Sequence, residues 1–141
     1  MIILTKPDFD EQDEALLLKA FHSTYASGDG PDVKLFESDL RKYLGVDHAY
    51  FVNSCTGALD MAYMVKDFPL GGEVLVPDFT YTSTALAPIL NGLKVVLVDV
   101  DPRNGLMDLN DAEKKITRKT IAISPVDYGG IPVDIDGVRQ I

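Results

Sequence analysis

The sequence lacks several features that are typical of common protein classes. It has a single cysteine, Cys55, among 141 residues, which excludes an internal disulfide and makes a reducing cytoplasm the expected location. The two histidines, His22 and His48, have no evident partner ligands in the sequence. We therefore expect no metal site.

Long basic runs and long apolar runs are also absent. No run of Lys and Arg is longer than the pair Lys114-Lys115, and the net charge is −9. Because nucleic-acid binding needs clustered positive charge, no nucleic-acid partner is expected. No apolar stretch approaches the roughly 18–20 residues of a membrane span, so no membrane partner is expected either. The chain starts Met-Ile-Ile-Leu-Thr-Lys-Pro and then turns acidic, a pattern that does not resemble a signal peptide.

The residues that are present alternate between strand and helix patterns from position 48 onward. The expected strands are 48–53, 73–77, 94–100 and 120–126, and the expected helices are 57–65, 82–91, 108–116 and one beginning after Asp134. Asp108 and Asp134 are the expected caps of the last two helices. Repeats of roughly 20–25 residues allow parallel crossovers, so this order predicts an α/β fold with a parallel sheet between layers of helices. The strands at 94–100 and 120–126 are nearly all apolar, which predicts burial on both faces.

The first part of the chain has a different pattern. Two amphipathic helices are expected at 10–26 and 33–44, with a Gly- and Pro-rich loop at 27–31 between them. Neither helix has enough partners for a core of its own. We expect residues 1–46 to form a helical arm laid on the sheet of 47–141, within a single structural domain.

Three strand ends carry the polar and aromatic residues that could bind a ligand. They are 53–57, 77–84 and 125–130, and ligands gather at the carboxyl ends of parallel strands. We expect the three to face one crevice that offers a phosphate seat at Ser54–Gly57, an aromatic plane at Tyr81 and a carboxylate at Asp127. The positive end of a helix dipole and its free N–H groups favour a phosphate at the first of them.

Each of these residues also has a simpler interpretation. Ser54 or Thr56 can equally be a helix cap, and Tyr81 can equally be a core aromatic. A turn role for Asp127 is favoured over a catalytic one, and Cys55 is favoured as a small space-filling residue over a nucleophile. The residues alone therefore indicate an α/β domain with a phosphate-bearing ligand.

Five segments in order, spread over nearly the whole chain, resemble a known family. The segments are Gly30-Pro31 with Phe36-Glu37 and 43–46, Ser54–Leu59, Glu73–Pro77 with Phe79–Tyr81, 92–102, and Pro125-Val126 with 130–136. Their order and spacing resemble the N-terminal portion of the DegT/DnrJ/StrS-type sugar aminotransferases. That resemblance implies a fold-type-I large domain and the cofactor pyridoxal 5′-phosphate (PLP).

The resemblance also implies roles for individual residues. Cys55 and Thr56 would hold the PLP phosphate through backbone amides, with the Thr56 hydroxyl as a further donor beside Ser54. Tyr81 would stack on the pyridine ring, and Thr80 would line the pocket. The sequence departs from the family at two places, because Cys55 stands where the family has glycine and Asp127 where it has histidine.

The resemblance implies transfer of an amino group from an amino acid to a keto nucleotide sugar. The expected amino donor is glutamate, and the expected oligomeric state is a homodimer. In the family, the lysine that forms the Schiff base and the aspartate beside the pyridinium nitrogen lie downstream of the position of Ile141. No catalytic residue is therefore assigned, and these 141 residues alone are expected to be inactive. Two alternatives stay open: a sugar 3-dehydratase of the same family, and a non-catalytic remnant or assembly partner with an exposed apolar surface.

Overall fold

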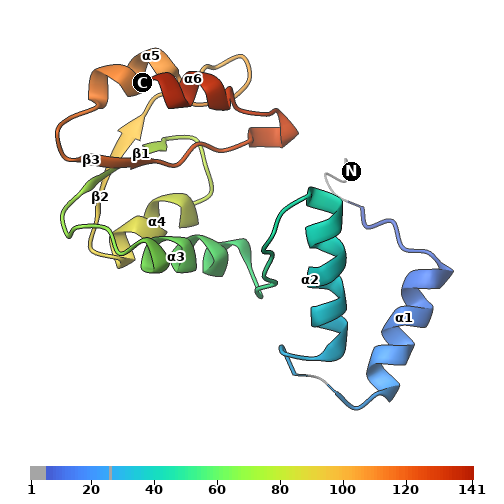
Figure 1. Cartoon of the computed structure of the whole chain (residues 1–141). Helices are drawn as coiled ribbons and strands as arrows, with labels where there is room; N and C mark the ends of the chain where they lie inside the picture. Colours follow the sequence, from blue (N-terminus) through green and yellow to red (C-terminus); the bar gives the residue numbers. More distant parts are fainter. Residues whose placement is uncertain (1–5, 26) are drawn as a thin grey trace. The chain divides into compact units, whose positions relative to one another are not determined.

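The computed structural model describes residues 6–25 and 27–141, and these form two compact units (Figure 1). One unit ends at Phe51 and the other begins at Val52. The first contains helices α1 (Glu11–His22) and α2 (Pro31–Leu44). The second contains α3 (Cys55–Lys66), β1 (Glu73–Pro77), α4 (Ser83–Leu90), β2 (Lys94–Val98), α5 (Leu109–Lys115), β3 (Thr120–Ile123), the 3₁₀ turn η1 (Tyr128–Gly130) and α6 (Ile135–Gln140).

Both helices of the first unit begin and end at residues that suit those positions. Asp10 caps α1 by accepting hydrogen bonds from the N–H groups of Gln12 and Asp13, and the Asp13 carboxylate accepts from the Asp10 N–H. Helix α2 ends at Gly45, whose φ of +66° is left-handed and suits glycine. The first helix ends earlier than its sequence pattern predicts, because Thr24 has a φ of +58°. Ala26, its predicted last residue, lies outside the described residues.

The second unit is built on a three-stranded parallel sheet in the order β2-β1-β3. Glu73 pairs with Lys94 on one side of β1, and Leu75 pairs with Ile123 on the other. Alternating strands and helices around a parallel sheet confirm the predicted α/β fold. No helix in the described part of the chain has both the length and the apolar character needed to cross a membrane.

The central strand β1 divides the core of the second unit into two clusters. Val74 and Val76 are fully buried on one face with Tyr63 of α3 and Ala87 of α4. Leu75 is fully buried on the opposite face with Val98, Met107 and Ala112. Successive side chains of a strand point to opposite faces, so β1 joins the two helical layers. Figure 1 shows α3 and α4 on one side of the sheet and α5 and α6 on the other.

The prediction of a strand at 48–53 is wrong. These residues form no strand, and the N–H of Phe51 donates to Oε1 of Glu37 at 2.8 Å. The Phe51 ring lies against Phe36, with centroids 5.4 Å apart. A strand needs a neighbouring strand for its backbone hydrogen bonds, and here a side chain of α2 takes that place. The first compact unit accordingly extends to Phe51.

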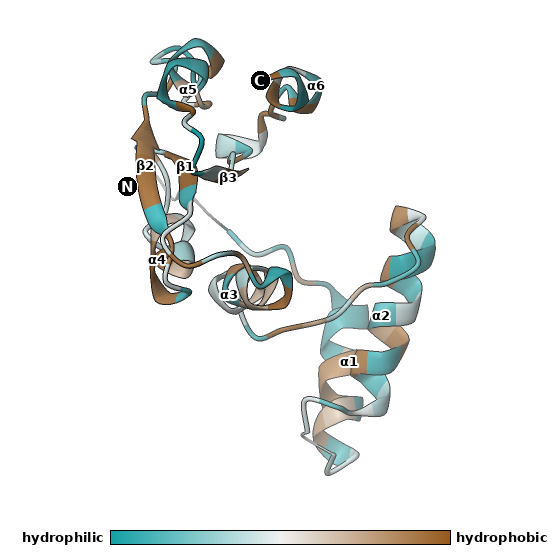
Figure 2. Ribbon diagram, turned by 60° about the vertical axis from the view of Figure 1, so that its left-hand side comes forward, coloured by the Kyte–Doolittle hydropathy of each residue, from teal (hydrophilic) through white to brown (hydrophobic). Residues whose placement is uncertain are grey.

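The two strands predicted to be buried on both faces are edge strands. β2 ends at Val98 and exposes 55% of Leu97, while β3 ends at Ile123 and is only partly buried. Figure 2 shows how apolar the residues of β1 and β2 are. Their apolar composition is similar, so the pattern could not tell which strand lies in the middle. The order β2-β1-β3 gives that place to β1.

Candidate functional site

The first predicted strand end is the N-terminus of α3, where Ser54 caps the helix. Its hydroxyl accepts a hydrogen bond from the N–H of Gly57 at 3.1 Å and donates to Oδ1 of Asn53 at 3.3 Å. Ser54 has extended backbone angles, as a cap residue should. The capping role that the sequence left open for Ser54 is therefore present.

Two N–H groups remain free beside this cap. Within the described part of the chain, the backbone N–H groups of Cys55 and Thr56 have no acceptor, because they begin the helix. Both residues are exposed, and the first turn of α3 carries no acidic residue. Free donors at the positive end of a 12-residue helix fit a phosphate group chemically. This donor set is compatible with the phosphate of the expected cofactor.

The second strand end is the connection from β1 to α4, which carries Thr80 and Tyr81. The hydroxyls of Thr80 and Thr84 lie 2.9 Å apart, and the N–H of Thr84 donates to the carbonyl of Tyr81 at 3.0 Å. Tyr81 itself is 75% exposed. The core interpretation of Tyr81 therefore does not hold in this structure.

The third strand end follows β3 and contains Asp127. Oδ1 of Asp127 accepts a hydrogen bond from the N–H of Val133 at 2.9 Å. The backbone carbonyl of Asp127 accepts a second one from the N–H of Gly130 at 3.1 Å. Asp127 thus closes the turn that leads through η1 toward α6. The structure agrees with the turn interpretation that the sequence favoured.

An aromatic contact joins the second and third strand ends. The ring centroids of Phe79 and Tyr128 lie 4.5 Å apart, with an angle of 38° between the planes. Gly105 lies against both rings, since a Cβ on it would stand 3.1 Å from Cδ1 of Tyr128 and 3.4 Å from Cδ1 of Phe79. We refer to Phe79, Tyr128 and Gly105 as the aromatic cluster.

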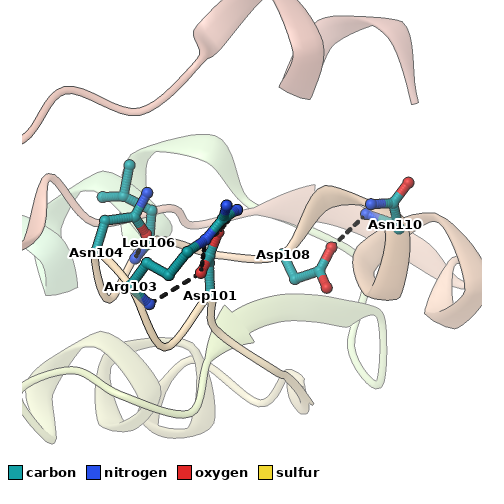
Figure 3. Close-up of polar contacts among 6 residues, drawn as sticks. All are labelled: Asp101, Arg103, Asn104, Leu106, Asp108 and Asn110. Atoms are coloured by element: carbon teal, nitrogen blue, oxygen red, sulfur yellow. Dashed lines mark hydrogen bonds and ion pairs between the residues drawn. The ribbon is translucent and has the colours of Figure 1, made fainter.

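The hairpin that carries Gly105 was missed by the sequence reasoning. It is closed by an antiparallel bridge between Val100 and Met107 and turns through Asn104 and Gly105. The Asn-Gly pair is a strong turn signal and could have identified it. Figure 3 shows its polar contacts, with Arg103 bound to Asp101 and Oδ1 of Asn104 accepting from the N–H of Leu106 at 2.9 Å.

A cavity of about 500 Å³ lies on this hairpin, and none of the five predicted site residues lines it. Its polar groups serve the local fold, because Asp108 caps α5 and Asp134 caps α6, as the sequence predicted. The Arg103 guanidinium and N–H hold the pKa of Asp101 at about 2 through hydrogen bonds. Asp101, Asp108 and Asp134 thus each accept hydrogen bonds from nearby residues of the chain, so the cavity does not define a ligand site.

The first strand end is connected to the second through the packing of α3 on α4. Nδ2 of Asn91, at the end of α4, donates to Oδ1 of Asp60 in α3 at 2.7 Å and to the carbonyl of Ala87 at 2.9 Å. The structure thus brings the second and third strand ends into direct contact, whereas this hydrogen bond joins α3 to α4 at the end of α4 that lies opposite Tyr81. Described His, Cys, Asp and Glu side chains form no group suited to hold a metal ion.

Comparison with known proteins identifies similar chains. The family model described as the DegT/DnrJ/EryC1/StrS aminotransferase family matches residues 7–141. The spore coat polysaccharide biosynthesis protein SpsC of Bacillus subtilis (strain 168) is 37% identical over 112 residues, which are 79% of this chain and 29% of SpsC. The GDP-perosamine synthase of Caulobacter vibrioides is 34% identical over 140 residues, covering 99% of this chain and 38% of the synthase.

Solved structures agree with these sequence matches. The PMP form of Spr1654 from Streptococcus pneumoniae, which carries the name of a sugar aminotransferase, has a TM-score of 0.90 at 31% identity and covers 99% of this chain and 35% of its own. The Escherichia coli GDP-4-keto-6-deoxy-D-mannose-3-dehydratase has a TM-score of 0.90 at 23% identity, covers 97% of this chain and 36% of its own, and shares the fold. The chain spans about a third of the length of the curated relatives it matches.

Proposed function

The chain belongs to the DegT/DnrJ/EryC1/StrS aminotransferase family, and on this premise we propose that it forms the phosphate-binding part of a PLP-dependent sugar aminotransferase. The reaction is transfer of an amino group from an amino acid, with glutamate as the proposed donor, to a keto nucleotide sugar. The resemblance to GDP-perosamine synthase and to the PMP form of Spr1654 supports this class of activity. The single cysteine supports a cytoplasmic location.

The observation that carries the proposal is the pair of free N–H groups at the start of α3. The N–H groups of Cys55 and Thr56 bind the cofactor phosphate, and Ser54 fixes the helix end by capping Gly57. Hydrogen bonds to a charged phosphate are stronger than those between neutral groups. The backbone of α3 therefore supplies most of the anchoring in this part of the site.

The connection between β1 and α4 provides the second contact. The exposed ring of Tyr81 stacks on the pyridine ring, while the hydroxyl pair of Thr80 and Thr84 holds the turn beside it. When bound, PLP supplies an electron sink for bond-breaking at the amino-bearing carbon. The role of these residues is to bind and orient the cofactor. We assign the residues that bond covalently to PLP, and those that transfer protons, to the part of the family members' length that these 141 residues do not cover.

A proline substitution tests the phosphate contact. Cys55→Pro removes the N–H of the first helical position, where proline is well tolerated, and Ser54 already has the extended conformation that precedes proline. Loss of one hydrogen bond to a charged group should weaken binding by about tenfold or more. Fluorescence titration of the protein with pyridoxamine 5′-phosphate (PMP) measures the affinity. PMP has no aldehyde, so the binding it reports needs no lysine.

Cys55→Ala is the matched control, because it keeps the N–H and removes only the thiol. We expect Cys55→Ala to bind PMP and inorganic phosphate as the wild type does, while Cys55→Pro weakens both. Equal affinity in Cys55→Pro and Cys55→Ala would show that α3 does not hold the phosphate. Such a result would remove the observation on which the proposed function rests.

We also propose that the protein acts as a homodimer. Helices α1 and α2 have no buried residue, and large apolar side chains of α1 are exposed, among them Leu17 at 70% and Phe21 at 77%. Apolar surface of this kind marks an interaction site. The same surface suits the alternative of a non-catalytic assembly partner, and PMP binding separates the two, because an assembly partner has no need of the cofactor.

A further inference from the structure

The position of Tyr81 depends on its backbone, because its side chain has little packing of its own. The ring is 75% exposed and has no aromatic partner among the described residues. Two backbone hydrogen bonds hold the ends of the connection, from the Asp78 N–H to the Val98 carbonyl at 2.9 Å and from the Thr84 N–H to the Tyr81 carbonyl at 3.0 Å. Between them the hydroxyls of Thr80 and Thr84 lie 2.9 Å apart, and the packing of Phe79 adds a further contact on the other side of Thr80.

Phe79 makes that contact through the aromatic cluster. It lies two residues before Tyr81, and its ring packs on Tyr128 at 4.5 Å. The two rings are about half exposed, so this contact lies at the surface near the carboxyl ends of β1 and β3. A stacked or tilted aromatic pair at this separation is attractive beyond its buried area. The turn after β3 thereby restrains the connection that carries Tyr81.

Gly105 places a third chain segment against the same rings. Its φ of +74° is left-handed, and a Cβ there would lie 3.1 Å from the Tyr128 ring, closer than most real contacts. Hydrogen bonds from the Gly105 N–H to the Asp101 carbonyl at 2.8 Å and from the Asp101 N–H to the Leu106 carbonyl at 2.9 Å make the hairpin rigid. Glycine allows this rigid hairpin to support both rings from one side.

We propose that Tyr128 and Gly105 are positioning residues for Tyr81 and act on it through Phe79. The inference rests on the proposed function, because Tyr81 is the residue that stacks on the cofactor ring. The cluster holds the 78–82 connection in the one conformation in which the Tyr81 ring faces its ligand. It makes no contribution to the phosphate contacts of α3, which lie on a different segment.

Two pairs of variants test this role in the protein. Gly105→Ala introduces a Cβ against the rings, and Gly71→Ala is its matched control, since Gly71 has a similar φ of +78° with open space around it. Tyr128→Leu removes one ring, and Tyr128→Phe keeps it. Titration with PMP reports ring and phosphate binding together, and titration with inorganic phosphate reports the phosphate seat alone. Amide hydrogen exchange at Thr84 reports the order of the connection without any ligand.

We expect Gly105→Ala and Tyr128→Leu to weaken PMP binding by about two- to tenfold, the range of one aromatic stacking contact, and to leave phosphate affinity unchanged. Exchange at the Thr84 N–H should become faster in both, while exchange in β1 stays slow and shows that the fold is intact. Tyr128→Phe and Gly71→Ala should behave as the wild type. A purely structural role would instead lower both affinities together.

The inference is overturned if Gly105→Ala matches Gly71→Ala, or if Thr84 exchange does not change in Tyr128→Leu. Tyr81→Leu separates this failure from that of the proposed function. If Tyr81→Leu weakens PMP binding and the cluster variants do not, the positioning role alone is wrong. If Tyr81→Leu binds PMP as tightly as the wild type, the stacking contact in the proposed function is wrong and the positioning role falls with it.

Discussion

At the scale of single residues, the best-defined electrostatic contact joins Asp101 to Arg103. Nε of Arg103 donates to the two carboxylate oxygens at 2.9 and 3.1 Å, and the Arg103 N–H donates at 2.9 Å. Side-chain and backbone hydrogen bonds, in that order of size, lower the Asp101 pKa from 3.8 to about 2. The Arg103 side chain is exposed and Asp101 is partly buried, so water weakens the ion pair and the contact shapes the hairpin more than it stabilises the whole fold.

We predict that Arg103→Met raises the pKa of Asp101 from about 2 toward 3.8. The pKa should stay below 3.8, because the backbone N–H of position 103 still donates to the carboxylate. A carboxyl NMR titration measures this shift, and Arg118→Met, which leaves the contact intact, serves as the control. An unchanged Asp101 pKa in Arg103→Met would show that the guanidinium is not the main cause.

The same shift sets the direction of a pH effect on stability. The folded pKa of Asp101 is lower than its unfolded value, so the contact stabilises the folded state fully above about pH 4. This stabilisation is lost as the pH falls from about 4 to 2, where the carboxylate becomes protonated in the folded state too. In Arg103→Met, the pH range over which this stabilisation is lost should be narrower, and its lower limit should lie above pH 2.

At the scale of secondary structure, the fold depends on which strand is central. Leu75 of β1 is fully buried, whereas Leu97 of the edge strand β2 is 55% exposed. We predict that Leu75→Ala lowers the free energy of unfolding by about 2–5 kcal/mol, the usual loss for a core leucine. Leu97→Ala should lower it by less than about 1 kcal/mol, since surface substitutions have small effects. Urea denaturation followed by circular dichroism compares the two, and similar losses would contradict the strand order.

The starts of α5 and α6 were predictable because local chemistry determines them. Asp108 and Asp134 cap their helices as expected, since an acidic residue before an amphipathic segment satisfies free N–H groups. The segment 48–53 has the composition of a strand, but its partner is the side chain of Glu37, and no local pattern reveals that. The edge position of β2 likewise depends on strand order, which is a property of the whole sheet.

The candidate site was predictable only in part for a related reason. The cap at Ser54 follows from residues next to each other in sequence, whereas the sequence left open whether Tyr81 is buried or exposed. The aromatic cluster joins three segments that are far apart in the chain, and Phe79, Gly105 and Tyr128 carry no shared local signal. The contacts within the aromatic cluster depend on the fold of the sheet, which brings the strand ends together, so they could not be predicted from local sequence.

At the scale of the whole molecule, the first unit exposes several large apolar side chains. Leu17 and Phe21 lie one turn apart on α1 and are both largely exposed. If they contact a second copy of the chain, replacing either with Gln should weaken self-association by about tenfold or more, given the value of a buried apolar side chain. Sedimentation velocity over a range of concentrations measures this effect.

Lys19→Gln on the same helix is the control, because it changes a polar residue between these two positions and should leave association unchanged. A wild-type protein that stays monomeric at all concentrations would contradict the dimer proposal. Equal association in Leu17→Gln and Lys19→Gln would place the contact elsewhere on the molecule.

The central position of β1 has a consequence for synthesis on the ribosome. One neighbour of β1 is β2, which follows in the chain after one helix. The other neighbour is β3, so Glu73 can pair with Thr120 only after the ribosome has made the residues between them. At about 5–20 residues per second, this interval lasts a few seconds. During that time one edge of an apolar strand is unpaired in the nascent chain, and such an edge is prone to pair with other chains. The newly made protein therefore passes through a stage in which chaperone binding at β1 would be most useful.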